Sequence, residues 1–347
     1  MLGWFSTNAR DLPWRRTRDP YAVWISETML QQTQVETVRG YFTRFLERFP
    51  TIAELAAADE REVLRLWEGL GYYRRARQLH AAARKMAEEH GGEFPRTPEA
   101  VRALPGVGRY TAGAVLSIAL DQREPILEAN TIRVYSRLLG YRGDPLKASG
   151  QKRLWEFAEA ILPPAGPECG QLNQAMMELG SAFCRPQQPG CLLCPVAALC
   201  PTRGHGLQEQ IPPVKARMRY ESVQEVAVLI RRRGQLLVRR CAADERWAGL
   251  WDFPRFQVES LPASTAAIQQ RIAEWLGIRI VVERSCHQIK YGVTRFRITL
   301  DAHAARYQSG RLAADPGLQW IDAQDLGELP LSVTGRKLAQ WAMKEDA

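Results

Sequence analysis

The chain has 347 residues, 46% of them hydrophobic, and a formal net charge of +9. This length exceeds what one ordinary core supports, so we expect two domains, and the arginine-dominated charge indicates either a polyanionic partner or a genome rich in arginine codons. No stretch reaches the roughly 18 to 20 apolar residues that span a bilayer, and the first residues lack a signal-peptide pattern, so we expect a cytosolic protein.

The first half of the chain carries a helical pattern. From Tyr21 to about Gln208, apolar residues recur at helical spacing, and short Gly/Pro segments such as "LPGVGR" and "LPPAGPE" separate the runs. We therefore predict an all-α domain over residues 1–207. A basic, proline-bearing connector without periodicity should follow at 208–220.

The pattern changes beyond the connector. Residues 222–240, 278–285 and 295–304 form alternating or β-branched runs typical of strands. Helical patterns appear between and after them, in "STAAIQQRIAEWLG" and "GRKLAQWAMK". The sequence therefore predicts a second, α/β domain over residues 221–347.

Four cysteines lie within a short segment at C-x6-C-x2-C-x5-C spacing: Cys184, Cys191, Cys194 and Cys200. In a cytosolic chain such cysteines indicate metal ligands before disulfides. Structural zinc usually takes two separated pairs, whereas these ligands lie in one loop with unequal spacing, which favours one [4Fe–4S] cluster. The three isolated cysteines are expected to be core thiols: Cys169, Cys241 and Cys286.

The segment "LPGVGRYTAGAVLSIAL" predicts a tight turn at residues 104–108 between two helices. Glycines permit positive φ and close backbone approach, so the N–H groups of Gly106, Val107 and Gly108 can face a phosphate at the start of a helix. This is the helix-hairpin-helix arrangement that binds a DNA backbone without reading its sequence.

The segment "PILEAN" at 125–130 has two interpretations. Glu128 can be a catalyst, or it can be only a charged residue that caps a helix, at a polar helix start where Asn130 caps the N–H groups without a partner. Taken alone, these six residues favour the capping interpretation. The surrounding motifs must decide between the two.

Together, the hairpin, this acid-x-Asn segment and the cysteine spacing resemble the helix-hairpin-helix base-excision glycosylases, which include endonuclease III. "LPWRRTRDPYAVWISETMLQQTQVETV", "LWEGLGYYRRARQLH" and "NQAMMELGSAFC" are similar to the MutY-type adenine DNA glycosylases, as is "WAGLWDFPRF". The resemblance covers nearly the whole chain. It implies an all-α helix-hairpin-helix glycosylase domain with an iron–sulfur loop, followed by an α/β Nudix-like domain.

The resemblance implies a monofunctional adenine DNA glycosylase of base excision repair. Such an enzyme flips adenine out of a mispair with 8-oxoguanine or guanine and hydrolyses its N-glycosidic bond. Glu27 matches the acid that protonates the base, and its apolar neighbours should raise its pKa. Glu128 matches the carboxylate that stabilises the sugar cation, and Asn130 would orient it or the substrate.

Tyr110 stands where endonuclease III-like enzymes carry the lysine that forms a Schiff base. The resemblance therefore implies no strand cleavage by that route. We expect the Tyr110 hydroxyl to bind the Glu128 carboxylate or the sugar.

The remaining matches concern DNA. Arg15 matches a residue close to the extruded base, while Leu30, Gln31 and Tyr72 belong to segments that fill or support the gap it leaves. The implied partner is double-stranded DNA with a mispair, bound by a monomer in a bacterial cytoplasm and associated with the nucleoid through DNA.

The catalytic segment departs from the family. The family reads Asp-Gly-Asn, whereas this chain reads Glu128-Ala129-Asn130. The extra methylene displaces the carboxylate by roughly 1.5 Å, and a displacement on the order of 1 Å can cost about a hundredfold in rate. We expect the backbone to compensate. The alternatives are a glycosylase with another base or mispair preference, or a lesion-binding protein without catalysis.

The Nudix-like half also departs from its relatives. The segment "QQRIAEWLG" lacks the acid cluster of true Nudix hydrolases, so pyrophosphohydrolase activity is not expected. The Phe-Ser-His stretch that reads 8-oxoguanine in the family aligns with Val293, Thr294 and Arg295. Threonine keeps a hydroxyl for the lesion, and arginine can contact a base edge or a phosphate.

Overall fold

The computed structural model describes residues 1–213 and 219–345. The chain divides into two compact units, of which the first comprises 1–58 with 75–216 and the second 59–74 with 217–347. Residues 214–218 of the expected connector lie outside the described residues. Over the described ranges, none of the helices combines the length and apolar character that crossing a bilayer requires.

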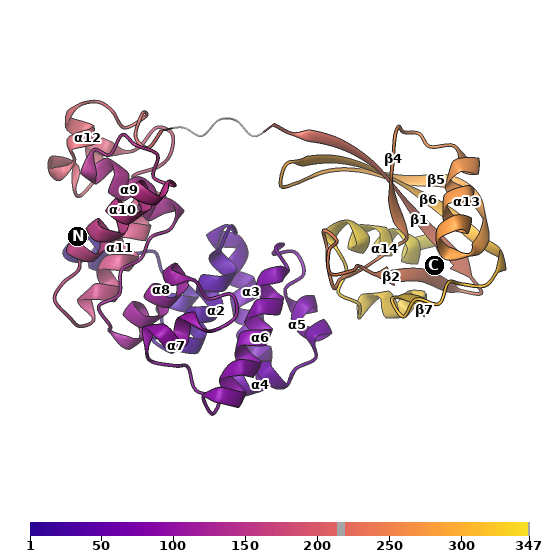
Figure 1. Ribbon diagram of the computed structural model, residues 1–347, viewed down its shortest axis with the longest axis horizontal. Helices are drawn as coiled ribbons and strands as arrows, with labels where there is room; N and C mark the ends of the chain where they lie inside the picture. Colours follow the sequence, from indigo (N-terminus) through magenta and orange to yellow (C-terminus); the bar gives the residue numbers. More distant parts are fainter. Residues whose placement is uncertain (214–218, 346–347) are drawn as a thin grey trace. The chain divides into compact units, whose positions relative to one another are not determined.

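The first unit is all-helical, as the sequence predicts (Figure 1). Its longer elements are α1 (Leu2–Asn8), α2 (Pro20–Leu30), α3 (Val35–Arg48), α4 (Ile52–Ala57), α6 (Arg74–Glu89), α7 (Pro98–Arg102), α8 (Arg109–Leu120), α9 (Ala129–Leu139), α10 (Ala148–Ala160) and α11 (Glu168–Ala182). Shorter ones are η1 (Pro13–Arg15), η2 (Cys191–Leu193), η3 (Ala197–Leu199) and α12 (Pro201–Gly204). Helix α5 (Glu60–Leu66) belongs to the second unit.

Helix α2 lies at the centre of the first unit. Its start combines Asp19, whose carboxylate accepts the N–H groups of Tyr21 and Ala22, with Pro20 at the first helical position. All its residues from 21 to 29 are buried, including Glu27. The helix therefore holds an ionisable group inside the unit.

Helix α8 packs closely against the extended segment that leads into α9. A Cβ atom on Gly113 would lie 2.3 Å from the carbonyl oxygen of Pro125, so only glycine permits this approach. The contact fixes the path of residues 125–128. It thereby sets the position of Glu128, which ends this segment.

The second unit contains a mixed seven-stranded sheet. Its strands are β1 (Glu221–Arg232), β2 (Gln235–Arg240), β3 (Trp251–Asp252), β4 (Arg255–Val258), β5 (Ile278–Val293), β6 (Phe296–Gly310) and β7 (Leu318–Asp322). The main order is β3-β2-β1-β6-β5, in which β1 and β6 are parallel, while β4 pairs with β1 and β7 with β2. The remaining elements are α13 (Thr265–Leu276), η4 (Ala323–Gly327) and α14 (Val333–Glu345).

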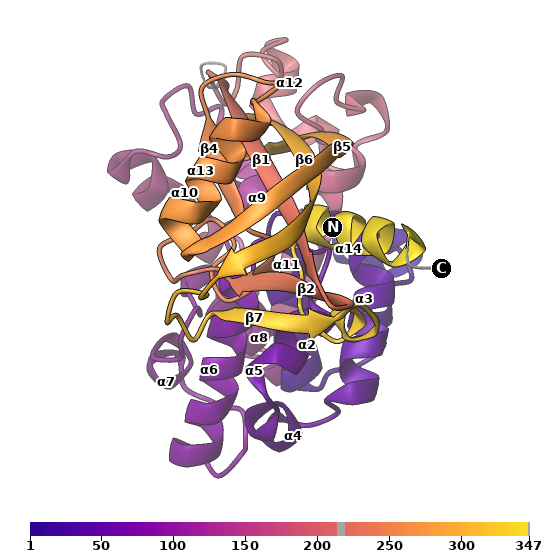
Figure 2. The same cartoon turned by 90° about the vertical axis from the view of Figure 1, so that its right-hand side faces the viewer.

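Helices α13 and α14 cover opposite faces of this sheet (Figures 1 and 2). Strand β1 shows why, since Val226 and Val228 pack with α13 whereas Ala227 and Leu229 pack with α14. Successive strand residues point to opposite faces, and here both faces are apolar. The predicted α/β domain is confirmed, although β3, β4 and β7 were not predicted.

Arg75 ties α6 to the end of α2. Its buried guanidinium donates to the carbonyl oxygens of Thr28 (2.8 Å), Met29 (2.9 Å) and Gln31 (2.5 Å). The last carbonyl groups of a helix have no partner inside the helix. Arg75 supplies donors to them where α2 ends.

We expect Arg75→Leu to lower the free energy of unfolding by about 3 kcal/mol, because it leaves buried carbonyl groups without a donor. Urea titration followed by circular dichroism measures this loss. Arg84→Leu is the control, since Arg84 lies exposed on the same helix and makes one long hydrogen bond of 3.4 Å to Ala56. Equal stability of the two variants would contradict the assigned role.

Candidate active site

A pocket of about 400 Å³ in the first unit lies between η1, α2, α8, α9 and α11. It is lined by predicted site residues that lie far apart in the sequence. These are Arg15, Glu27, Leu30, Gln31, Tyr110, Glu128 and Asn130. The structure thus brings both candidate carboxylates into one cavity.

Glu27 is a buried acid with a tyrosine partner. The Tyr110 hydroxyl donates to Glu27 Oε2 at 2.5 Å and also lies 3.5 Å from Met177 Sδ. Burial raises the pKa of Glu27 to about 7, and the charge of Glu128 adds to this rise while the hydrogen bond from Tyr110 opposes it. Glu27 therefore retains its proton near neutral pH far more readily than an exposed glutamate.

Of the two partners expected for the Tyr110 hydroxyl, the Glu128 carboxylate is wrong, and the sugar stays a prediction. Tyr110 lies in the first turn of α8 and its hydroxyl reaches α2 instead. The Glu128 carboxylate accepts hydrogen bonds from other donors. The sequence could not show this, because it does not reveal which acid faces the hydroxyl.

Those donors are backbone groups of α9. Glu128 Oε1 accepts the N–H of Thr131 and Oε2 that of Asn130, both at 2.8 Å, while the Glu128 N–H donates to the Thr131 hydroxyl. This is a capping box in which Glu128 itself is the N-cap. Burial raises the pKa of Glu128 and the two backbone bonds oppose the rise, so its pKa remains above the ordinary value.

The capping interpretation is therefore confirmed for Glu128, whereas its assignment of a cap to Asn130 is wrong. The helix begins at Ala129, which places Asn130 inside its first turn. The Asn130 side-chain oxygen instead accepts a hydrogen bond from Arg133 at 2.9 Å. A carboxylate competes better than an amide for backbone N–H groups, because charge-assisted bonds are stronger.

Glu178 is a pocket residue that the sequence did not single out. Its carboxylate is 2% exposed and accepts from Arg10 Nε at 2.6 Å and from an Arg15 guanidinium nitrogen at 2.8 Å. Burial alone would raise the pKa of Glu178, but the two arginines lower it below the ordinary value. Arg15, expected near an extruded base, is thus held at the pocket wall by an ionised acid.

The four clustered cysteines line a single pocket at the end of the first unit. All are free thiols, and Arg137 lies 3.3 Å from Cys184 Sγ while donating to the carbonyl oxygens of Ile211 (2.8 Å) and Gln208 (2.5 Å). Arg137 therefore ties the cysteine loop to the segment that follows it. Among residues 1–213 and 219–345, no three His, Cys, Asp or Glu side chains form a group that could hold one metal ion.

The cysteine loop is joined to the pocket by Arg133. Its guanidinium donates to the carbonyl oxygens of Cys184 (2.6 Å) and Gly180 (2.8 Å) and to the side chain of Asn130. Asn130 lies two residues from Glu128. One side chain thus connects the first cysteine with the start of α9.

The predicted turn between α7 and α8 is confirmed. Gly106 has φ +76°, and a Cβ on it would lie 2.7 Å from Gln78 Cβ, so both conformation and space require glycine. Gly108 is the N-cap of α8, whereas the Val107 side chain is buried. The turn can therefore offer its backbone, and Val107 contributes no exposed side chain.

The other predicted DNA-contacting residues belong to the second unit. Tyr72 is half exposed and has φ +49°. Thr294 also has φ +49°, and with Arg295 it forms the turn between β5 and β6. Arg295 is exposed and pairs with Glu221 at 3.3 Å. The aligned stretch from Val293 is therefore the tip of a hairpin, and positive φ in a β-branched residue is unusual there.

Two family models match the chain. The HhH-GPD superfamily base excision DNA repair protein matches residues 25–160, and the NUDIX domain matches 225–341. An adenine DNA glycosylase of Schizosaccharomyces pombe is 33% identical over 405 residues, covering 97% of this chain and 87% of that protein. The chain belongs to the adenine DNA glycosylase family.

Two mammalian members of this family are longer than the chain. The adenine DNA glycosylase of Mus musculus is 38% identical over 95% of this chain, and that of Rattus norvegicus is 49% identical over 58%. The chain spans 66% of the mouse protein and 40% of the rat protein. A solved thermostable thymine-DNA glycosylase is 32% identical with a TM-score of 0.54, covering 59% of this chain and 93% of that one.

We expect Tyr110→Phe to raise the pKa of Glu27 above about 7, because the hydroxyl that stabilises the ionised carboxylate is lost. Infrared titration of the protonated carboxyl band, identified by its loss in Glu27→Gln, measures this value.

The matched control is Tyr21→Phe, which removes a buried hydroxyl bonded to the Phe49 carbonyl oxygen at 2.7 Å and not to Glu27. The pKa of Glu27 should be the same in this variant as in the unaltered protein. A pKa that falls or stays constant in Tyr110→Phe would contradict the role given to the hydroxyl.

Proposed function

We propose that the chain is a monofunctional DNA glycosylase that hydrolyses the N-glycosidic bond of adenine mispaired with 8-oxoguanine or guanine. The observation that supports this most is the pairing of a proton-holding acid, Glu27, with a second carboxylate, Glu128, in one pocket. Relatives named adenine DNA glycosylase over most of the chain support the choice of base.

In the proposed reaction, Glu27 is the general acid. Adenine leaves readily only when protonated, and a neutral Glu27 supplies that proton as the bond from the base nitrogen to the sugar C1′ breaks. The bonding electron pair goes to the base and a positive charge develops on the sugar. Tyr110 holds the Glu27 carboxyl in place and limits how far its pKa rises.

Glu128 faces the developing sugar cation in this proposal. A carboxylate has about four lone-pair positions, and the backbone of α9 uses two of them. The others remain for electrostatic stabilisation of the cation or for a transient bond to it. Water then adds to C1′, loses a proton to a carboxylate, and leaves an abasic site.

Two further observations support the finer assignments. None of the described residues that line the pocket is lysine, which agrees with hydrolysis in place of Schiff-base chemistry. The turn at 104–108 and the side chains of Leu30 and Gln31 in the first unit would hold the duplex around a flipped nucleotide, and Tyr72 of the second unit would also contact DNA. The Thr294 hydroxyl and Arg295 would face the opposite strand.

We also propose one [4Fe–4S] cluster on the four clustered cysteines. Four free thiols around one pocket fit it, because each iron of such a cluster takes one thiolate, whereas a single zinc ion requires all four to meet at one point. The cluster would hold the loop together and take no part in excision. Arg137 and Arg133 would position that loop against α9.

Single-turnover adenine release from an 8-oxoguanine:adenine duplex tests the reaction. We expect Glu27→Gln to be about a hundred- to ten-thousandfold slower, because no proton reaches the base. Glu128→Gln should lose at least about a hundredfold, since the charge opposite the sugar disappears. Glu128→Asp keeps both the charge and the capping function but draws the carboxylate back by one methylene, so it should lose less rate than Glu128→Gln.

A thymine:adenine duplex is the control and should release no adenine. Release of adenine from a guanine:adenine duplex would agree with the proposal, whereas release of thymine from a guanine:thymine duplex would identify an altered preference. Unchanged rates in Glu27→Gln would overturn the acid assignment. Tight binding of every mispair without release of any base would overturn the glycosylase proposal.

Purified protein should be brown, with an absorption band at about 400 nm and close to four irons per chain. Cys194→Ser should remove the colour, whereas Cys169→Ser should not, since Cys169 lies buried away from the loop. A colourless protein with stoichiometric zinc would contradict the iron assignment.

A further inference from the structure

The second unit contains a pocket of about 510 Å³ that the reaction proposed above does not use. It lies between the β5–β6 hairpin, the loop from 241 to 250 and the start of α14, with residues 71–73 at its rim. Its size falls within the range of sites for small organic groups. Thr294, at the hairpin tip, is also part of its lining.

The wall of this pocket is aromatic. The rings of Trp247 and Tyr291 lie 6.2 Å apart at 33°, and Phe296 lines the same space. Trp247 is only half buried. Flat, partly exposed rings of this kind are the surfaces on which nucleobases stack.

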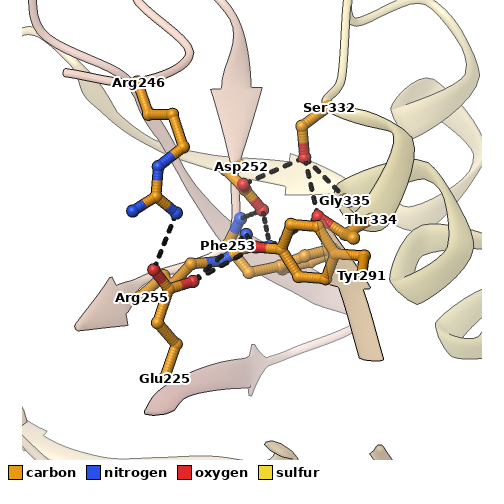
Figure 3. A network of polar contacts seen from close by, with 9 residues as sticks. All are labelled: Glu225, Arg246, Asp252, Phe253, Arg255, Tyr291, Ser332, Thr334 and Gly335. Carbon is orange, nitrogen blue, oxygen red and sulfur yellow. Dashed lines mark hydrogen bonds and ion pairs between the residues drawn. The ribbon is translucent and has the colours of Figure 1, made fainter. Parts of the chain in front are cut away.

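A buried polar network fixes this wall from behind (Figure 3). Glu225 accepts hydrogen bonds from Arg246 at 2.9 Å and from the Tyr291 hydroxyl at 3.2 Å, so one carboxylate holds both side chains. Arg255, whose side chain is 7% exposed, donates to Asp252 and Thr334 at 3.1 Å. The guanidinium of Arg255 also lies 4.9 Å from the Trp247 ring.

The charged side chains that line the pocket are all cationic among its described residues. Lys290, Lys337 and Arg246 contribute to it, whereas none of its described lining residues is Asp or Glu. Arg246 is neutralised by Glu225. Neither lysine forms a side-chain hydrogen bond or ion pair with any part of the chain that the structure describes. Their charges therefore suit a phosphate.

We propose that this pocket binds a nucleotide of the DNA strand opposite the excised adenine. Its base stacks on Trp247 and Tyr291, and its phosphate faces Lys290 and Lys337. This deepens the proposed function and rests on it, because it adds a stacking site to the hairpin tip that reads the opposite strand. The Glu225 and Arg255 network would be the device that keeps the stacking wall in place before DNA arrives.

The test uses the full chain with Glu27→Gln, which binds without excising. Two duplexes serve as probes. One has 8-oxoguanine opposite adenine, and the other has fluorescent 2-aminopurine in place of the 8-oxoguanine. We expect Trp247→Ala to weaken binding of the first about ten- to a hundredfold and to abolish quenching of the second. Trp247→Phe should restore most of both, because it retains a ring.

The charge assignment has its own readout. Replacing both Lys290 and Lys337 by alanine should reduce the dependence of log affinity on log salt by about 1, because the two lysines face one phosphate. Trp320→Ala is the matched control, since Trp320 is a half-buried ring on β7 that packs on Tyr307 outside the pocket. It should leave binding and quenching unchanged.

The outcomes separate this inference from the proposed function. Circular dichroism must first show that Trp247→Ala and Trp320→Ala are both folded. If the two variants then bind and quench equally, the proposed nucleotide site is overturned, even if the chain with Glu27 intact releases adenine. Binding that depends on Trp247 in a chain that releases no base would support the pocket and overturn excision. An unchanged salt dependence in the double-lysine variant would overturn the phosphate contact.

Discussion

A buried carboxylate must meet hydrogen-bond donors or carry a proton, and the candidate active site depends on this constraint. Three glutamates of the first unit meet it in different ways. Two arginines keep Glu178 ionised, backbone N–H groups hold Glu128, and a single tyrosine hydroxyl faces Glu27. Their pKa values move apart accordingly, since that of Glu178 falls while that of Glu27 rises to about 7. One acid of the pocket keeps its proton, while the other acids accept hydrogen bonds from stronger donors. Such a combination suits acid-assisted bond cleavage.

The same constraint applies to buried acids of the second unit. Glu225 and Asp252 lie inside the sheet domain, where Arg255 and Arg246 neutralise them. No acid cluster remains on α13 for metal chemistry, because its sequence carries Gln269, Gln270 and Arg271 together with one glutamate. The sheet domain has a buried polar centre, and that centre binds side chains of a surface pocket.

Much of this could be predicted from local sequence, because the signals are short-range. Cysteine spacing identified four thiols around one pocket, and "LPGVGR" identified a turn whose glycine is required by φ and space. Contacts between distant residues could not be predicted. Arg10 and Glu178 are 168 residues apart, and although Glu178 lies within "NQAMMELGSAFC", that segment does not indicate its partner. Strand β3 has only two residues, too few for any alternation. The acid that Tyr110 faces depends on how α8 packs on α2.

The capping box at Glu128 restricts what evolution can place there. The side chain must accept N–H groups from the first turn of α9, which Asp, Asn, Ser and Thr also do. In the proposed reaction it must also carry a negative charge beside the sugar. Only aspartate and glutamate satisfy both requirements. Exchange between these two acids is therefore the one substitution at this position that keeps both the cap of α9 and the negative charge. Glu128 in place of the family's aspartate is such an exchange.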